Sequence, residues 1–331
     1  MKLSKIRIYY IAAVLLLLVL IVSNIFMGSA DLSFGEIIRV LNEKETLGIA
    51  GRIIWYARLP RIFACVMAGA GLAVSGVVIQ GVLMNHLASP GIIGVNAGAG
   101  LAVTLCCAFG TFSGWIIAGS AFLGAVISVL LVAVTAQKVG ASRTTVILGG
   151  VAVNSCLTAI SEAVSILIPE AGMLAADFRV GGFSAVAYTR LFPAGILILS
   201  GLLILFSLCN ELDVLSLGED TAHGLGMKVK NMRTIFLALA ALLAGAVVSY
   251  AGLLGFVGLI VPHGARKLVG VQNNILLPFC ALCGADLVLF CDLLARNLFI
   301  PYEVPVGIVM SVVGAPFFVF LLVKSKGGHR A

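Results

Sequence analysis

The fold is decided by stretches such as residues 144–168, TTVILGGVAVNSCLTAISEAVSILI, which is apolar over a length that crosses a bilayer. At about 100° per residue, its six polar side chains fall on one helical face: Asn154, Ser155, Thr158, Ser161, Glu162 and Ser165. A charged side chain near the bilayer centre costs at least ~2.5 kcal/mol, so this face indicates a bundle interior or a water-filled path. The alternative is contact between packed helices, because Ser, Thr and Asn also hydrogen-bond across membrane helices.

The same apolar character runs through the whole chain of 331 residues. Hydrophobic residues make up 61% and charged residues 11%, against about 50% and 25% in soluble domains. This composition excludes a soluble globular domain and predicts an all-α, polytopic membrane bundle in which residues 1–331 form one integral domain. Two gaps, 28–61 and 210–233, are expected outside the membrane. Ten candidate spans of roughly 20 residues follow: 8–27, 62–84, 92–110, 114–136, 144–168, 191–209, 234–252, 254–268, 275–295 and 304–323.

Ten spans would place both termini on the same side of the membrane. With both termini in the cytoplasm, 13 of the 21 Lys and Arg residues lie inside and eight outside, as the positive-inside rule requires. The first span follows Lys2, Lys5 and Arg7 and could also suit a secretory signal. It is long for a signal and lacks a small-residue cleavage site, which favours a retained signal anchor.

A reversal near Gly252 is expected, since one helix over both flanking spans would be too long for a bilayer.

Two capping-box spacings mark short helices outside the membrane. Ser33 and Glu36 predict a helix on the outer surface, and Ser216 and Glu219 predict one on the inner surface that Gly224 and Gly226 would end. The inner segment is the only long cytoplasmic connection. Connections of this length are usually functional, so a soluble partner is expected to dock there; a passive linker is the alternative.

Sequence signatures of chemistry are missing from the chain. There is no G-x-x-x-x-G-K-[ST], H-E-x-x-H or G-x-S-x-G pattern, so nucleotide hydrolysis by the chain itself is not expected. The four histidines lie in separate segments, and the pair Cys280 and Cys283 has no second pair beside it, so packing is favoured over a metal site. No cofactor and no metal are expected.

Eight motifs in order resemble the FecCD/BtuC-type permease subunits of binding-protein-dependent ABC importers for iron-siderophores, haem and cobalamin. They span most of the bundle and are Arg58-Leu-Pro-Arg61, Gly76-x-x-x-Gln80-Gly81, Asn85-x-Leu-Ala-x-Pro-Gly-x-x-Gly94, Leu215-Ser-Leu-Gly-Glu219 running to Leu225-Gly226, Gly255-Phe-Val-Gly-Leu-Ile-Val-Pro-His263, Asp292-x-x-x-Arg296, Glu303-x-Pro-x-Gly307 and Gly314-Ala-Pro-Phe317.

The resemblance implies a type II importer permease with about ten transmembrane helices in a bacterial cytoplasmic membrane. Its implied partners are a second permease subunit (a copy or a paralogue), two cytoplasmic ATPase subunits and an external substrate-binding protein. The resemblance also implies roles for three sets of residues. The binding protein would contact Arg58, Arg61 and Arg296; the path would be lined by the polar face of residues 144–168; and the ATPase would contact Leu215, Ser216, Leu217, Gly218, Glu219, Leu225 and Gly226.

The function expected from this resemblance is inward transport of an iron complex, most naturally a siderophore complex, without covalent chemistry by this chain. A haem or cobalamin permease on the same scaffold is an alternative. A membrane-embedded enzyme would require Glu162, Asp286 and His263 to converge. A secondary transporter would leave the long inner connection without a role. For Arg296, an internal pair with Asp292 one turn away is the alternative to docking.

Overall fold

The computed structural model describes residues 3–30, 32–43, 48–111, 113–139 and 143–327, and helices are the only regular elements in these ranges. The elements are α1 (Leu3–Phe26), α2 (Phe34–Glu43), α3 (Ile49–Arg52), the π-helix η1 (Ile53–Arg58), α4 (Leu59–Leu83), α5 (Val95–Ala108), α6 (Gly114–Val139), α7 (Arg143–Leu167), α8 (Pro169–Leu174), α9 (Ala176–Val180), α10 (Tyr188–Ser207), α11 (Cys209–Ser216), α12 (Glu219–Gly224), α13 (Val229–Ala251), α14 (Val257–Val269), α15 (Asn273–Asn297) and α16 (Val306–Gly327).

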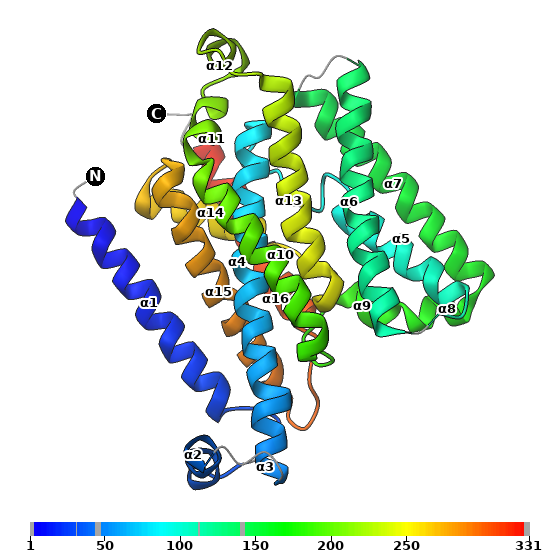
Figure 1. Cartoon of the computed structure of the whole chain (residues 1–331), viewed down its shortest axis with the longest axis vertical. Helices are drawn as coiled ribbons and strands as arrows, with labels where there is room; N and C mark the ends of the chain where they lie inside the picture. Colours follow the sequence, from blue (N-terminus) through cyan, green and yellow to red (C-terminus); the bar gives the residue numbers. More distant parts are fainter. Residues whose placement is uncertain (1–2, 31, 44–47, 112, 140–142, 328–331) are drawn as a thin grey trace.

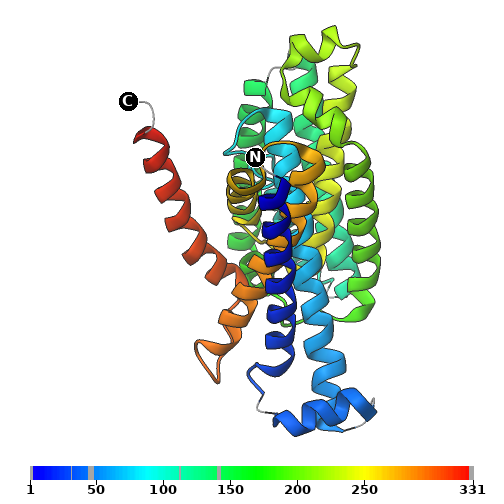
Figure 2. The same ribbon diagram turned by 90° about the vertical axis from the view of Figure 1, so that its left-hand side faces the viewer.

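Helix α4 is the centre of the bundle. It packs against α13, α14 and α15, while α5, α6 and α7 form a group on the far side of α13, as Figure 1 shows. Helices α2 and α3 lie at the bottom of the molecule in Figure 1, and α8 and α9 lie at the lower end of the group formed by α5, α6 and α7. The opposite end holds α12, the start of α1 and the end of α16 (Figures 1 and 2). The two ends of the chain therefore lie on the same side of the bundle, as an even number of crossings requires.

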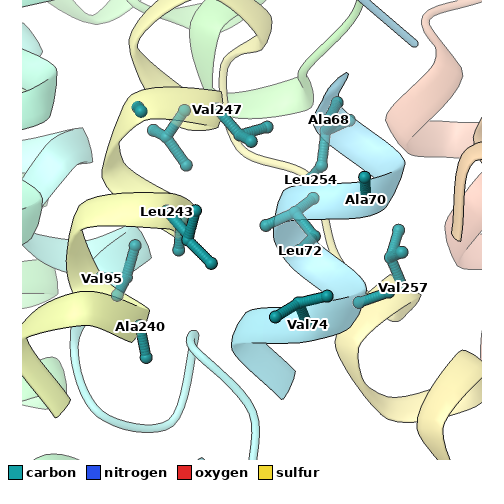
Figure 3. Close-up of a cluster of buried hydrophobic side chains, with 14 of the residues drawn as sticks. Ala68, Ala70, Leu72, Val74, Val95, Ala240, Leu243, Val247, Leu254 and Val257 are labelled. Carbon is teal, nitrogen blue, oxygen red and sulfur yellow. The ribbon is translucent and has the colours of Figure 1, made fainter. Parts of the chain in front are cut away.

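Glycine makes the central helix crossings close. A Cβ on Gly69 would lie 2.1 Å from the carbonyl oxygen of Gly284, and a Cβ on Gly76 would lie 2.1 Å from that of Gly258. Any larger residue would push α4 away from α15 or α14. Small and β-branched apolar residues fill the remaining space, including Ala68 of α4 and Val247 of α13 (Figure 3). Membrane helices associate through this kind of close backbone packing.

Every one of the ten predicted spans contains a helix. Within the described ranges, seven helical stretches are long and apolar enough to cross a membrane: α1, the continuous α3–η1–α4, α6, α7, α10, α13 and α15. Helices α5 and α14 are shorter, with 14 and 13 residues, and the part of α16 with described side chains, Val306–Val319, is also shorter than a full crossing. The membrane bundle is confirmed, whereas the number of complete crossings is not.

The helix of the second predicted span, 62–84, begins well before that span. The continuous helix runs over 35 residues, Ile49–Leu83, which is about 52 Å at 1.5 Å per residue and longer than a bilayer core of about 30 Å. Its first turns therefore project beyond the hydrocarbon. There, Ile37 and Val40 of α2 pack on Ile54 in a small separate apolar cluster. This contact explains why the connection at 28–61 is largely helical rather than a loop.

Local signals give a mixed result. The reversal after α13 is confirmed, because Gly252 has a φ of +71° and ends that helix. The outer capping box is confirmed as well: the backbone N–H of Ser33 donates to Glu36, and the N–H of Glu36 donates to the Ser33 hydroxyl. The prediction that Ser216 starts a helix is wrong, since its hydroxyl donates to the carbonyl of Leu212 at the end of α11.

Helix α16 leaves the bundle as it runs toward its C-terminal end (Figure 2). Its side chains at Val312 and Val319 are 67% and 58% exposed. Helix α7 is also largely exposed, with Leu148 and Ile166 at 63% and 78%. Large apolar side chains of this kind have to meet lipid or another protein.

Candidate functional site: the polar face of α7 and the two ends of the bundle

The polar face of α7 divides into two parts. Ser155, Thr158 and Glu162 are exposed, and Asn154 is half-buried. Ser161 is buried, and its hydroxyl lies 3.0 Å from the hydroxyl of Thr104 in α5. The sequence treated the six residues as one stripe. The structure places part of the stripe in contact between helices and leaves the rest open.

An arginine of the short helix α9 contacts the buried part of this polar face. Nη2 of Arg179, at the end of α9, donates to the hydroxyls of Thr104, Ser161 and Ser165 over 3.0, 3.1 and 2.7 Å. Three helices therefore meet at one guanidinium nitrogen. Sequence reasoning missed this cluster, because Arg179 and Thr104 are separated by 75 positions and neither stands in a recognisable pattern.

Close backbone contacts fix α9 at this end of the bundle. The N–H of Gly182 donates to the carbonyl of Ala251 over 2.8 Å, and the N–H of Gly307 donates to that of Gly181 over 3.1 Å. A Cβ on Gly307 would lie 1.9 Å from the carbonyl oxygen of Val180. The end of α9, the turn after α13 and the start of α16 thus form one junction that tolerates no side chain at Gly307.

The three arginines expected to meet a binding protein are buried. Arg58 is 4% exposed, Arg61 9% and Arg296 3%. The Arg58 guanidinium donates to the main-chain carbonyls of Ile25, Phe26 and Ala30. The premise that these arginines place positive charge on the outer surface is therefore wrong for a single copy of the chain.

Asp292 joins the other two arginines. Its Oδ1 accepts a hydrogen bond from Nε of Arg61 over 2.9 Å. Its Oδ2 lies 3.1 Å from Nε of Arg296, without the alignment of a hydrogen bond, so this contact is ionic. Arg296 also donates to the side-chain oxygen of Asn24 in α1. The internal Asp292–Arg296 pair considered from the sequence is present, and Arg61 shares the same carboxylate.

Glu303 forms the outer edge of this network. Nη1 of Arg61 donates to it over 2.7 Å, and the Ser29 hydroxyl donates over 2.6 Å. Burial raises the pKa of Glu303, but these hydrogen bonds and the nearby arginine charges outweigh it and leave the pKa below its ordinary value. A cavity of about 360 Å³ opens beside Arg61 and Glu303 and extends to Asp177 and Gly252. This end of the bundle therefore offers a polar hollow next to a buried ion-pair network.

The opposite end presents an elbow between α11 and α12. Leu215 is buried, whereas Leu217 and Leu225 are 63% and 64% exposed. Gly218, with a φ of +120°, forms the bend before α12. Glu219 accepts a hydrogen bond from Arg233 of α13 over 3.0 Å, which ties the elbow to the bundle. Gly226, with a φ of +83°, follows the end of α12 as the sequence predicted.

From the sequence, no metal site is expected in the described part of the chain. No group of three or more His, Cys, Asp or Glu side chains is placed there to hold a metal ion. Glu162, Asp286 and His263 accordingly form no common cluster among the described residues. The convergence that an embedded enzyme would require is not present.

Comparison with known proteins gives consistent matches along the chain. The FecCD transport family matches residues 15–324. The iron(3+)-hydroxamate import permease FhuG of Bacillus subtilis is 37% identical over 83% of this chain and 84% of its own length. The Fe(3+)-citrate import permease YfmD of the same organism is 36% identical over 92% and 90%. The hemin transport permease HmuU of Yersinia pestis is 32% identical over 94% of both.

A solved structure matches the fold over nearly the whole chain. It is a metal-chelate type ABC transporter in an inward-facing conformation, and it superposes with a TM-score of 0.86 at 32% identity, covering 96% of this chain and 99% of the other. The arrangement of helices described above is therefore that of a known transporter subunit.

Proposed function

The chain belongs to the FecCD transport family and is a membrane permease subunit of an ABC importer, and from this premise we propose that it moves a ferric complex inward by alternating access. Relatives named for hydroxamate and citrate complexes of iron favour a siderophore-type cargo. A relative named for hemin makes haem the second candidate. Both cargoes would use the same scaffold and differ in the side chains along the path.

The open polar face of α7 carries this proposal. Ser155, Thr158 and Glu162 are exposed on a helix whose neighbouring surface is apolar. Contact of this face with lipid would be costly. A second permease subunit, a copy or a paralogue, would cover α7 and α16 and enclose a polar path between the two subunits. Asn154, Ser161 and Ser165 would then support the wall of the path from behind.

We expect Ser155→Leu and Thr158→Leu each to lower iron uptake about tenfold, equivalent to ~1.4 kcal/mol on the transport barrier, because they narrow and dry the path. Glu162→Gln removes only a charge and should also lower uptake. The measurement is ⁵⁵Fe uptake by cells that express the chain with its partner subunits. Ser161→Leu should instead reduce assembly, since Ser161 is buried against α5.

Ser207→Leu is the matched control for Ser155→Leu. Ser207 is also an exposed serine, but it lies near the end of α10, a helix that packs against α13 and α4. Its uptake should equal that of the unmodified protein. Equal uptake by all exposed-face variants, or a loss that only follows reduced protein yield, would contradict the path.

Energy for transport would come from partner ATPase subunits, because the sequence contains no phosphate-binding loop. We assign their contact to the elbow formed by Leu215, Ser216, Leu217, Gly218, Glu219, Leu225 and Gly226. Leu217 and Leu225 are its exposed apolar groups. This end would face the cytoplasm, which also places both chain termini there and agrees with the positive-inside distribution.

An external binding protein would dock at the opposite end, over the hollow beside Glu303. Arg58 and Arg296 are buried and bound to groups of their own chain, so they would hold the platform in shape. Arg61 is the one within reach, because the Glu303 side chain that accepts its hydrogen bond is 29% exposed. A carboxylate of the binding protein could replace Glu303 as the partner of Arg61.

If this exchange of partners occurs, Glu303→Gln should strengthen binding of the external protein. Removing the internal competitor should tighten binding-protein docking about three-fold, equivalent to ~0.7 kcal/mol, whereas Arg61→Gln should weaken it. The measurement is binding-protein affinity for the permease in nanodiscs, at low and high salt. Unchanged affinity in both variants would show that Arg61 has only a structural role.

A further inference from the structure

Arg179 differs from Arg61, Arg233 and Arg296 because hydroxyls hold it rather than carboxylates. Its Nη2 carries only two hydrogens, and three hydroxyl oxygens share them. Within the described part of the chain, no carboxylate pairs with Arg179, in contrast to Arg61, Arg296 and Arg233. Hydroxyl groups orient a guanidinium but do not neutralise it. Among the described residues, Arg179 is therefore held by hydroxyl groups without an ion-pair partner.

The remaining donors of Arg179 are available to a ligand. No described residue accepts a hydrogen bond from its Nε or Nη1, and the side chain is half-buried rather than enclosed. A guanidinium presents five donors in a rigid fork that matches two carboxylate oxygens. With Nη2 fixed from behind by Thr104, Ser161 and Ser165, little side-chain entropy is left to lose when an anion binds.

The position of Arg179 places this charge beside the path. Ser161 and Ser165, which hold it, are neighbours of Glu162 on α7, whose carboxylate is exposed on the open polar face. On its other side, the end of α9 is hydrogen-bonded to the start of α16 through Gly181 and Gly307. Arg179 thus lies where α7, α9 and α16 meet, at the end of the bundle opposite the α11–α12 elbow (Figure 1).

Building on the proposed function, we propose that Arg179 is a specificity-determining residue that binds a carboxylate oxygen of an anionic ferric chelate at the outer end of the path. The substrate class is a ferric complex of hydroxycarboxylate ligands, which carries net negative charge and presents carboxylate oxygens at its surface. A neutral ferric trihydroxamate offers no such group. The charge of Arg179 would attract the first class and leave the second unaffected.

The test compares ⁵⁵Fe uptake from ferric citrate and from a neutral ferric trihydroxamate, in cells that express the full chain with its partner subunits. The unmodified protein should import ferric citrate. Arg179→Gln should lower that import at least tenfold at sub-saturating concentration, mainly through a higher apparent KM, because glutamine is polar but carries no charge. Arg179→Lys should recover part of the import.

Two further variants separate binding from folding. Ser165→Ala removes the shortest hydrogen bond to Arg179 and keeps the charge, so the apparent KM for ferric citrate should rise about three-fold. Arg190→Gln is the control: Arg190 lies near the start of α10 and donates to the carbonyl of Ala185, and its loss should leave uptake unchanged. Melting of the purified Arg179→Gln protein in detergent should stay close to that of the unmodified protein.

Other outcomes overturn the inference in distinguishable ways. Import of only the neutral complex would leave the proposed function standing and overturn the role of Arg179. Equal losses in Arg179→Gln and Arg179→Lys, with a lower melting temperature, would make Arg179 a structural residue. Import of neither complex nor haem would overturn the proposed function itself.

Discussion

Asp292→Asn should destabilise the subunit by about 3–5 kcal/mol, because it leaves two buried arginines without their shared counter-charge. The Asp292 side chain is 1% exposed, and those of Arg61 and Arg296 are 11% and 4% exposed. Asparagine has nearly the same volume, so packing is preserved and only the charge is lost. The measurement is the thermal unfolding of the purified subunit in detergent, together with the yield of folded protein.

Glu43→Gln is the control for this substitution. Glu43 also accepts a hydrogen bond from an arginine, Arg39, one turn earlier on α2, but both side chains are well exposed, at 60% and 66%. Exposed pairs typically contribute less than ~1 kcal/mol, so the melting temperature should hardly change. A small effect of Asp292→Asn, similar to that of Glu43→Gln, would mean that water reaches the network and screens it.

The double substitution Leu217→Asp with Leu225→Asp should abolish transport while the membrane bundle still folds. Both leucines are well exposed at the elbow, so their replacement removes little packing within the subunit. If they fill pockets on the ATPase, each truncation of such an anchor costs ~2 kcal/mol or more, and together they would weaken the complex by roughly a thousand-fold. The measurements are co-purification of the ATPase with the tagged permease and ⁵⁵Fe uptake.

Thr221→Asp is the matched control, because Thr221 is exposed on α12 between the two leucines and receives the same new charge. It should retain the ATPase and most of the uptake. If the double variant also retained both, the connection between α11 and α13 would be a passive linker, which is the alternative that the sequence left open.

The arginine motifs show how a correct pattern can suggest an incomplete role. Positive charge at the expected outer side of a membrane protein departs from the positive-inside distribution, which suggests that a negatively charged partner compensates it. The sequence identified Arg58, Arg61 and Arg296 but supplied only one nearby acid, Asp292, at helical spacing from Arg296. The structure brings Asp292 to Arg61 across 231 positions and main-chain carbonyls to Arg58. Much of the compensation therefore comes from the chain itself.

The sequence by itself determined the membrane class, the helical architecture and which stretches form the long apolar helices, because an apolar run of about 20 residues has few options in a bilayer. Its ordered motifs also predicted the family. Glycines with local roles were predicted where a turn demands them, as at Gly252 and Gly226. Properties of this kind depend on residues that are close in the sequence.

Only the tertiary structure decided which polar groups face each other. Ser161 and Thr158 look equivalent on a helical face, yet one is buried against Thr104 and Arg179 and the other is exposed. Their difference arises from the direction in which α5 and α9 approach α7, and helical periodicity contains no information about that direction. The elbow illustrates the same limit, since Ser216 is the last residue of α11, where its hydroxyl donates to the carbonyl of Leu212, and α12 begins only after the bend at Gly218.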